Sequence, residues 1–306
     1  MDVSEPFSVL RSVRQGDSLS PLLYVLSIEP FANNIRNNPD IKGLKLPGVN
    51  MESKISQYAD DASFILTTLE SIRLVLAECK IYGTASGALL NLDKSCGTWL
   101  GAWKLRQDKP YGISWVTVKK LLGIHMGPGS SSPMNWGPIL KRFTAALNDN
   151  QYRNSSMYGR ATIANILASS KLYYVASHMP LPKDYEVQFT RTIFKYVWGG
   201  QHEAIKRETL YADPLEGGLG IVSPRVKCQA LLIRHIFTFL HLGKDGYFPK
   251  WGYFTIYWIG FNLRSIRPEY GSNLIPHCLQ FRPPFYKKAL ELFKAYERLL
   301  IEPPLR

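Results

Sequence analysis

Two adjacent acidic residues between two strand-like segments constrain the fold of this chain more than any other feature. Residues 51–57 mix apolar and polar side chains, and residues 62–68 are rich in Phe, Ile and Leu. This pattern is typical of a hairpin with Asp60 and Asp61 at its tip. Paired carboxylates repel each other, so the pair is best explained by a bound divalent cation that neutralises both charges. Mg²⁺ suits such a site because it binds few carboxylates and completes its coordination shell with water and substrate phosphates. For the dipeptide alone, a solvated turn is the alternative.

Further motifs surround this pair in a definite order. Upstream lies VRQGDSLSPLLY (residues 13–24); downstream follow ASG (85–87) with LNLDKS (90–95), and LLGI (121–124). With the acidic pair, these segments resemble motifs B, C, D and E of a reverse transcriptase palm, and in detail those of non-LTR retrotransposons of the LINE type. The resemblance is close from residue 7 to about residue 127 and looser beyond. It implies an RNA-directed DNA polymerase, in which a primer 3′-hydroxyl attacks the α-phosphate of a dNTP at a two-metal site.

The resemblance also assigns roles to residues of the central motifs. Asp60 would be a direct Mg²⁺ ligand with Asp61 close and supporting, and Tyr58 would lie beside the nucleotide. Lys94 would stand near the departing pyrophosphate, where a cation neutralises or protonates the leaving group. A surface lysine is the alternative for Lys94.

The two outer motifs would contact the substrates. Gln15 and Gly16, before an expected helix, would meet the incoming nucleotide and template at a helix N-terminus. Arg14 would add phosphate contacts, unless it is a solvated arginine. Leu122 and Gly123 belong to the segment that resembles the primer grip, where a glycine allows close approach of nucleic acid. Gly123 is alternatively a plain hairpin glycine.

The family's metal site uses a third carboxylate on motif A, a strand before motif B. Within residues 1–12 no Asp has that context, because Asp2 lies in a polar start. We therefore expect part of a polymerase, with motif A and the fingers outside this chain and with little activity alone. The alternatives are a decayed or repurposed protein that binds nucleic acid without polymerising, and a reading frame cut short with neither function.

Composition agrees with an RNA template and a DNA primer as partners. The 306 residues carry a net charge of +13 and a pI near 9.5, which favours an acidic polymer. The four cysteines are far apart and predict neither disulfides nor a zinc site, so the protein is expected in the nucleus or cytoplasm. No apolar run approaches the roughly 18 residues of a membrane span, and no membrane partner is expected.

The expected fold class is α+β. A partial palm, a small antiparallel sheet with packing helices, should occupy residues 1–127, a Gly-, Pro- and Ser-rich linker 128–133, a helical thumb 134–200 and a post-thumb region 201–306. Apolar periodicity predicts helices at 22–35, 70–82, 136–147, 158–178, 185–197, 230–242 and 285–301, and strand-like segments at 6–10, 96–103, 112–116 and 121–125. Ser18 or Ser20 is expected to cap the first helix.

The aromatic segment 247–261 either stacks on bases or, more often for such clusters, forms part of the hydrophobic core. Some thumb cations are expected to contact phosphates: Lys141, Arg142, Arg153, Arg160, Lys171, Arg191 and Lys195.

Overall fold

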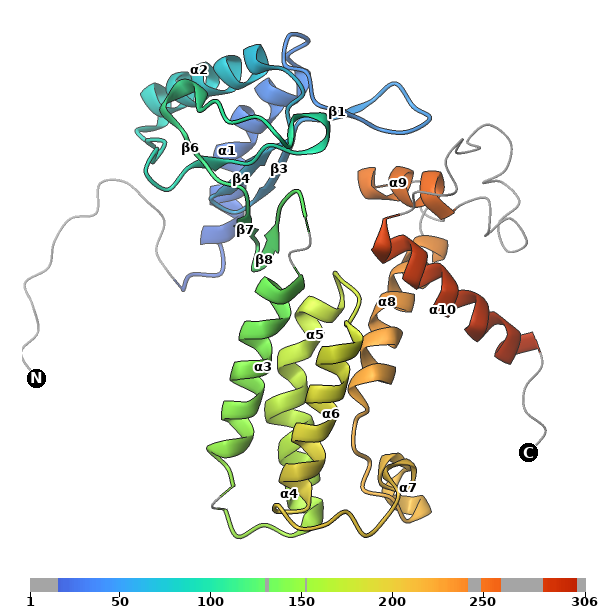
Figure 1. Ribbon diagram of the computed structural model, residues 1–306. Coiled ribbons are helices and arrows are strands. Elements are labelled where there is room, and N and C mark those ends of the chain that lie inside the picture. Colours follow the sequence, from blue (N-terminus) through green and yellow to red (C-terminus); the bar gives the residue numbers. More distant parts are fainter. Residues whose placement is uncertain (1–15, 130–131, 152, 242–248, 260–282, 302–306) are drawn as a thin grey trace, which may run out of the picture. The chain divides into compact units, whose positions relative to one another are not determined.

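The computed structural model describes residues 16–129, 132–151, 153–241, 249–259 and 283–301 (Figure 1). The expected strand at 6–10 lies outside these ranges. The chain divides into two compact units, residues 1–95 with 109–114, and residues 96–108 with 115–306. Short antiparallel strands and many helices confirm the α+β class. Within the described ranges, no helix is long and apolar enough to cross a membrane.

The first unit packs two long helices against a hairpin. Its elements are α1 (Ser20–Asn37), β1 (Leu44–Lys45), β2 (Glu52–Ser53), β3 (Ile55–Tyr58), β4 (Asp61–Phe64) and α2 (Leu69–Ser86). Strands β1 and β2 pair with each other, as do β3 and β4, both antiparallel. The buried side chains come from both helices and the hairpin: Phe31, Ala32, Ile35, Ile41, Ile55 and Val75. This core holds the β3–β4 hairpin against α1.

The ends of α1 and α2 follow local sequence rules. Helix α1 has Leu19 at its N-cap with no side-chain cap, so the expected serine cap is wrong. Instead, the Asp17 carboxylate accepts a hydrogen bond from the Leu19 N–H at 2.8 Å, and Pro21 occupies the first turn. Helix α2 begins at a Thr68 cap and ends at Gly87, whose φ of 74° is left-handed.

The second unit begins with short strands around a tryptophan cluster. Strand β5 (Cys96–Gly97) is followed by a 3₁₀ turn, η1 (Gly101–Trp103), and the short β6 covers Ser114–Trp115. The strands expected at 96–103 and 112–116 are therefore mostly wrong. The Trp99 and Trp115 rings stack at 3.7 Å, and the Arg106 guanidinium lies over Trp99 and Trp103 at 4.9 and 4.8 Å. Ring packing, rather than a long ladder of backbone hydrogen bonds, organises this segment.

Helices make up most of the second unit after the hairpin of β7 (Lys119–Leu121) and β8 (Ile124–Met126). They are α3 (Ser132–Asn148), α4 (Met157–Ile163), the π-helical η3 (Ala164–Ser169), α5 (Ser170–Ala176), α6 (Lys183–Val197), α7 (Arg207–Tyr211), α8 (Pro224–His241), α9 (Lys250–Ile259) and α10 (Pro284–Ile301), with a 3₁₀ turn η4 (Pro214–Glu216). The expected helices are all present, and α3 starts inside the segment expected as a linker. Figure 1 shows α3, α5 and α6 side by side, as their packing contacts require.

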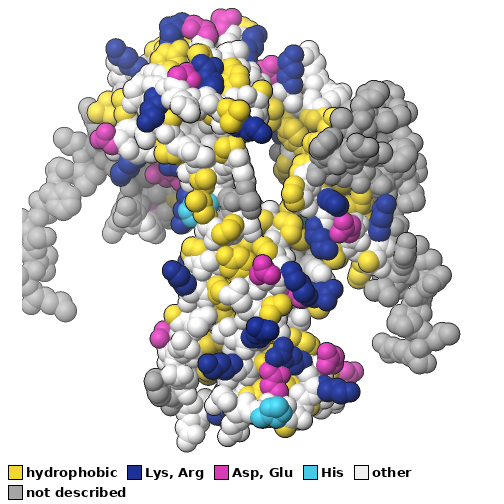
Figure 2. All heavy atoms as spheres, in the orientation of Figure 1, with side chains coloured by type: hydrophobic (Ala, Val, Ile, Leu, Met, Phe, Trp, Pro, Cys, Tyr) yellow, Lys and Arg dark blue, Asp and Glu magenta, His cyan; other side chains and the backbone are white. Residues whose placement is uncertain are grey.

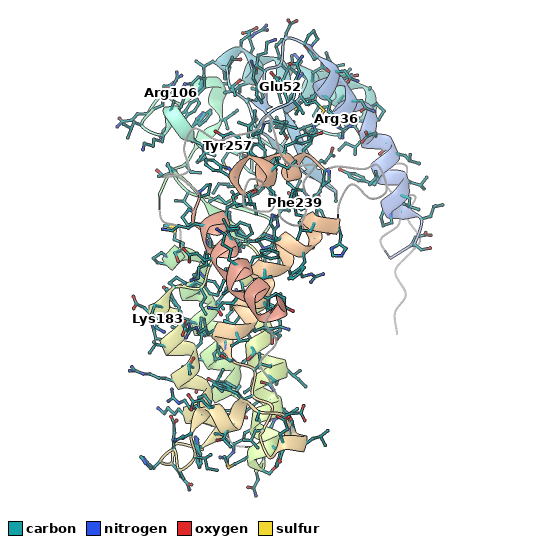
Figure 3. The ribbon with its side chains drawn as sticks, turned by 90° about the vertical axis from the view of Figure 1, so that its right-hand side faces the viewer. Arg36, Glu52, Arg106, Lys183, Phe239 and Tyr257 are labelled. Atoms are coloured by element: carbon teal, nitrogen blue, oxygen red, sulfur yellow. The ribbon has the colours of Figure 1, made fainter. Side chains whose placement is uncertain are left out.

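Two apolar clusters hold these helices together. The larger one joins α3 to α6 and α8 through fully buried rings such as Trp136, Phe143, Phe189 and Phe194. The smaller one joins α8, α9 and α10 around Phe239, which is labelled in Figure 3. Helix α9 contains most of the aromatic segment, and its Ile256 and Trp258 pack on this cluster. Trp251 is exposed and Trp258 is only partly buried, so α9 contributes to this core while stacking of its rings on bases stays a prediction.

Candidate active site

The acidic pair lies at the tip of the β3–β4 hairpin, as expected. Tyr58 pairs with Asp61 across the last register position, so Ala59 and Asp60 form the turn. Ala59 has a φ of 51°, a left-handed conformation that is uncommon for a residue with a side chain. The Gln57 side-chain amide donates to the Ala59 carbonyl at 3.1 Å and supports this turn. Both exposed acidic residues therefore lie at the tip of the hairpin.

Asp60, Asp61 and Tyr58 are all exposed, and 71% of the Tyr58 surface is accessible. In the described part of the chain neither carboxylate forms an ion pair, and no group of three or more His, Cys, Asp or Glu residues is arranged to hold a metal ion. Two carboxylates nevertheless suit Mg²⁺, which proteins often bind through one or two carboxylates together with substrate phosphates. The donor set fits the ion as a partial site.

The start of α1 was expected to contact the nucleotide. Gly16 has a left-handed φ of 86° just before the helix, and no atom of the described residues lies within 4 Å of the position that a Cβ would take. The described part of the chain therefore leaves its surface open to a ligand. Arg14 and Gln15 lie outside the described residues, so their expected roles remain predictions.

Lys94 lies in an exposed turn after α2. Its backbone N–H donates to the Asn91 side chain at 3.1 Å, and the Ser95 hydroxyl donates to the Asn91 carbonyl at 2.8 Å. Among the described residues its ammonium group forms no ion pair with a carboxylate. The turn leaves the side chain free to meet an anion, while its role near pyrophosphate remains a prediction.

Leu122 and Gly123 form the tight turn of the β7–β8 hairpin instead of lying within a strand. Their φ values of 43° and 88° are both positive, as a type I′ turn requires. The Tyr174 hydroxyl, from α5, donates a hydrogen bond to the Leu122 carbonyl. Leu121, Ile124 and His125 are strand residues, but the turn divides the single strand expected at 121–125 into two, because periodicity does not reveal a two-residue turn inside a short apolar run.

Asn135 anchors the same hairpin to α3. Its side-chain oxygen accepts from the His125 N–H at 2.8 Å, and its side-chain amide donates to the His125 carbonyl at 3.0 Å. Asn135 is 4% exposed, so these bonds are shielded from water. Neither Asn135 nor Tyr174 stands in a sequence motif, and both act across tertiary contacts, so no local pattern predicts their roles.

Basic side chains are spread over the helices of the second unit (Figure 2). Six of the seven cations expected to contact phosphates are exposed: Lys141, Arg142, Arg153, Lys171, Arg191 and Lys195. Arg160 is different, because its guanidinium donates to the Val197 carbonyl at 3.2 Å and lies against Gly199. This contact satisfies the C-terminal end of α6, which makes Arg160 a structural residue in this unit.

Comparison with known proteins finds a family similarity for the first part of the chain, which contains these motifs. Residues 2–126 match the family model described as reverse transcriptase (RNA-dependent DNA polymerase). The match contains the acidic hairpin, the start of α1 and the β7–β8 turn. The chain resembles the reverse transcriptases of non-LTR retrotransposons.

A curated relative supports this resemblance over a longer stretch. The transposon TX1 uncharacterized 149 kDa protein of Xenopus laevis is 27% identical over 257 residues, which cover 81% of this chain. The similarity therefore extends from the reverse transcriptase segment into the helical unit. The aligned stretch spans 19% of the relative, so this chain corresponds to about a fifth of its length.

Proposed function

We propose that this chain contributes the acidic metal-binding hairpin, the nucleotide-facing helix and the primer grip of an RNA-directed DNA polymerase. The observation that carries the proposal is the Asp60-Asp61 pair at a hairpin tip, inside a segment that matches the reverse transcriptase family. Residues 1–127 would act as palm and residues 134–200 as thumb. RNA template, DNA primer and dNTP would be the substrates.

In the proposed reaction each residue has a defined task. Asp60 and Asp61 would hold Mg²⁺, which lowers the energy of the negative charge that develops on the transferred phosphoryl group. Gly16, at the open start of α1, would lie against the nucleotide, and Lys94 would neutralise the leaving pyrophosphate. The Leu122–Gly123 turn would hold the primer end through its backbone, which Tyr174 and Asn135 keep in place.

Substitution of Asp60 tests the polymerase assignment. In an intact parent polymerase that contains this segment, Asp60→Ala should reduce Mg²⁺-dependent primer extension at least about a thousandfold, because losing a metal ligand removes several kcal/mol of transition-state stabilisation. Binding of primer–template should change little. Asp40→Ala is the matched control, since Asp40 is an exposed carboxylate of the same unit. Extension that survives Asp60→Ala would overturn the assignment of Asp60.

A second candidate is a nucleic-acid-binding protein that does not polymerise. It is favoured by the net charge of +13 and by the lack, among the described residues, of a third metal-ligating side chain near the acidic pair. This candidate predicts that the protein binds primer–template duplex, that affinity falls steeply with salt, and that no extension occurs with Mg²⁺. Failure to bind duplex at low salt would exclude it.

A further inference from the structure

Two contacts define how α1 runs along the β3–β4 hairpin. The Lys54 ammonium, just before β3, donates to the Arg36 carbonyl at 3.0 Å and to the Asn38 carbonyl at 2.7 Å, at the C-terminal end of the helix. Nearer the middle of α1, the Phe31 ring meets Phe64, the last residue of β4, edge to face at 6.3 Å. The C-terminal half of α1 thus lies at the open end of the hairpin, away from its turn.

The same geometry places Tyr24 near the acidic turn. Tyr24 precedes Phe31 by two helical turns, and seven helical residues span about 10.5 Å. The strand from Phe64 back to Asp61 covers three residues, or about 10 Å. Burial raises the pKa of the Tyr24 hydroxyl most, and the negative charge of Asp60 raises that pKa further. The two lengths and this electrostatic interaction agree that Tyr24 faces the turn.

The Tyr24 hydroxyl differs from that of its neighbour Tyr82. Tyr82 donates a hydrogen bond to the Ser27 carbonyl at 3.2 Å. Tyr24 is half-buried, yet within the described ranges no protein group forms a hydrogen bond with its hydroxyl. The Tyr24 hydroxyl does not belong to the fully buried, unpartnered polar atoms, so water can reach it and it remains available as a donor to a carboxylate of the acidic turn.

We infer that Tyr24 is a positioning residue for Asp60, donating a hydrogen bond to its carboxylate when that carboxylate binds a divalent cation. Donors of this kind orient ligating carboxylates, and their loss weakens metal affinity about 10- to 100-fold. The inference rests on the proposed function, because it takes Asp60 as a metal ligand. It assigns the N-terminal half of α1 a second task beside its contact with the nucleotide.

The test measures Mn²⁺ binding directly, by titration of the full chain followed by electron paramagnetic resonance, with primer–template and dNTP present. Tyr24→Phe keeps the ring and removes the hydroxyl, so Mn²⁺ affinity should fall about tenfold or more, without a fall in melting temperature. Tyr82→Phe is the matched control. It removes a hydroxyl that is already hydrogen-bonded, so it should lower the melting temperature and leave Mn²⁺ affinity unchanged.

Asp60→Ala, measured in the same way, distinguishes a failure of the metal site from a failure of the role of Tyr24. If the unchanged protein binds Mn²⁺ no better than Asp60→Ala does, the metal site itself is wrong and the role of Tyr24 falls with it. If Asp60→Ala abolishes binding while Tyr24→Phe binds like the unchanged protein, the metal site stands and the role of Tyr24 is overturned. A tenfold loss in Tyr24→Phe together with unchanged Tyr82→Phe supports the inference.

Discussion

The Tyr174 hydroxyl donates a hydrogen bond to the Leu122 carbonyl, joining α5 to the turn of the β7–β8 hairpin. Helix and turn are separated by about fifty residues of sequence, and one side chain sets the position of the proposed primer grip. A backbone carbonyl at a tight turn has no ladder partner, so the tyrosine satisfies a group that strand pairing leaves open.

Removing this hydroxyl should loosen the turn. We expect Tyr174→Phe to lower the free energy of unfolding by about 1 kcal/mol, the usual net value of one hydrogen bond. Hydrogen exchange of the backbone amides around residues 121–124 should speed up. Tyr185→Phe serves as control, because no described group forms a hydrogen bond with the Tyr185 hydroxyl. Equal exchange in both variants would show that Tyr174 does not hold the turn.

Gly123 should not tolerate a side chain. Its φ of 88° is strained for any other residue, and a Cβ would lie 3.1 Å from Cε1 of Tyr174. We expect Gly123→Ala to destabilise the protein by more than about 1 kcal/mol. Gly200→Ala is a matched control for the backbone strain, since Gly200 has a φ of 82° and no atom of a described residue lies within 4 Å of its Cβ position. Urea unfolding compares the two, and a smaller loss in Gly123→Ala would contradict the close contact.

Lys54 should stabilise the junction of α1 and the acidic hairpin. Its side chain is 9% exposed, and its ammonium satisfies two carbonyls at the end of the helix, where a positive charge also favours the helix dipole. Lys54→Met keeps most of the apolar stem and should cost about 2 kcal/mol of unfolding free energy. Lys45→Met, at an exposed position, should cost little. Similar unfolding midpoints in urea for both variants would argue against the anchoring role.

Acidification should weaken the packing around His235. Burial is the main cause that lowers the pKa of His235, and the positive charge of His178 lowers it further. The unfolded chain therefore binds a proton near pH 6.5 while the folded state resists it, so the free energy of unfolding decreases as pH falls from about 6.5 toward the lowered pKa. Aromatic rings surround the imidazole, with Trp251 at 4.6 Å and Phe285 at 5.0 Å.

Melting temperatures between pH 7.5 and 5 measure this effect. His235→Phe should flatten the decline, whereas His202→Gln, at an exposed histidine, should leave it unchanged. A decline of the same size in His235→Phe would assign it to other groups.

Local sequence patterns were sufficient to predict the helices and the hairpin whose characteristic residues lie close together in the chain. The period of 3.6 predicted the long helices, and two apolar segments around Asp60 and Asp61 predicted the hairpin, because burial on one face imposes those spacings. The same patterns failed for residues 96–103 and 121–125. There, stacked tryptophans and a two-residue turn shorten or divide the expected strands, and neither produces a periodic sequence pattern.

The sequence by itself determined the order of the motifs, the acidic pair, the basic charge and the α+β class. Each of these features depends on the amino-acid composition or on residues that are close together in the chain. Only the tertiary structure decided that Tyr174 and Asn135 hold the β7–β8 turn and that Arg160 satisfies the C-terminal end of α6. These relationships join residues distant in the chain. Their partners are chosen by how helices and hairpins pack, a property of the whole core that no short window of sequence contains.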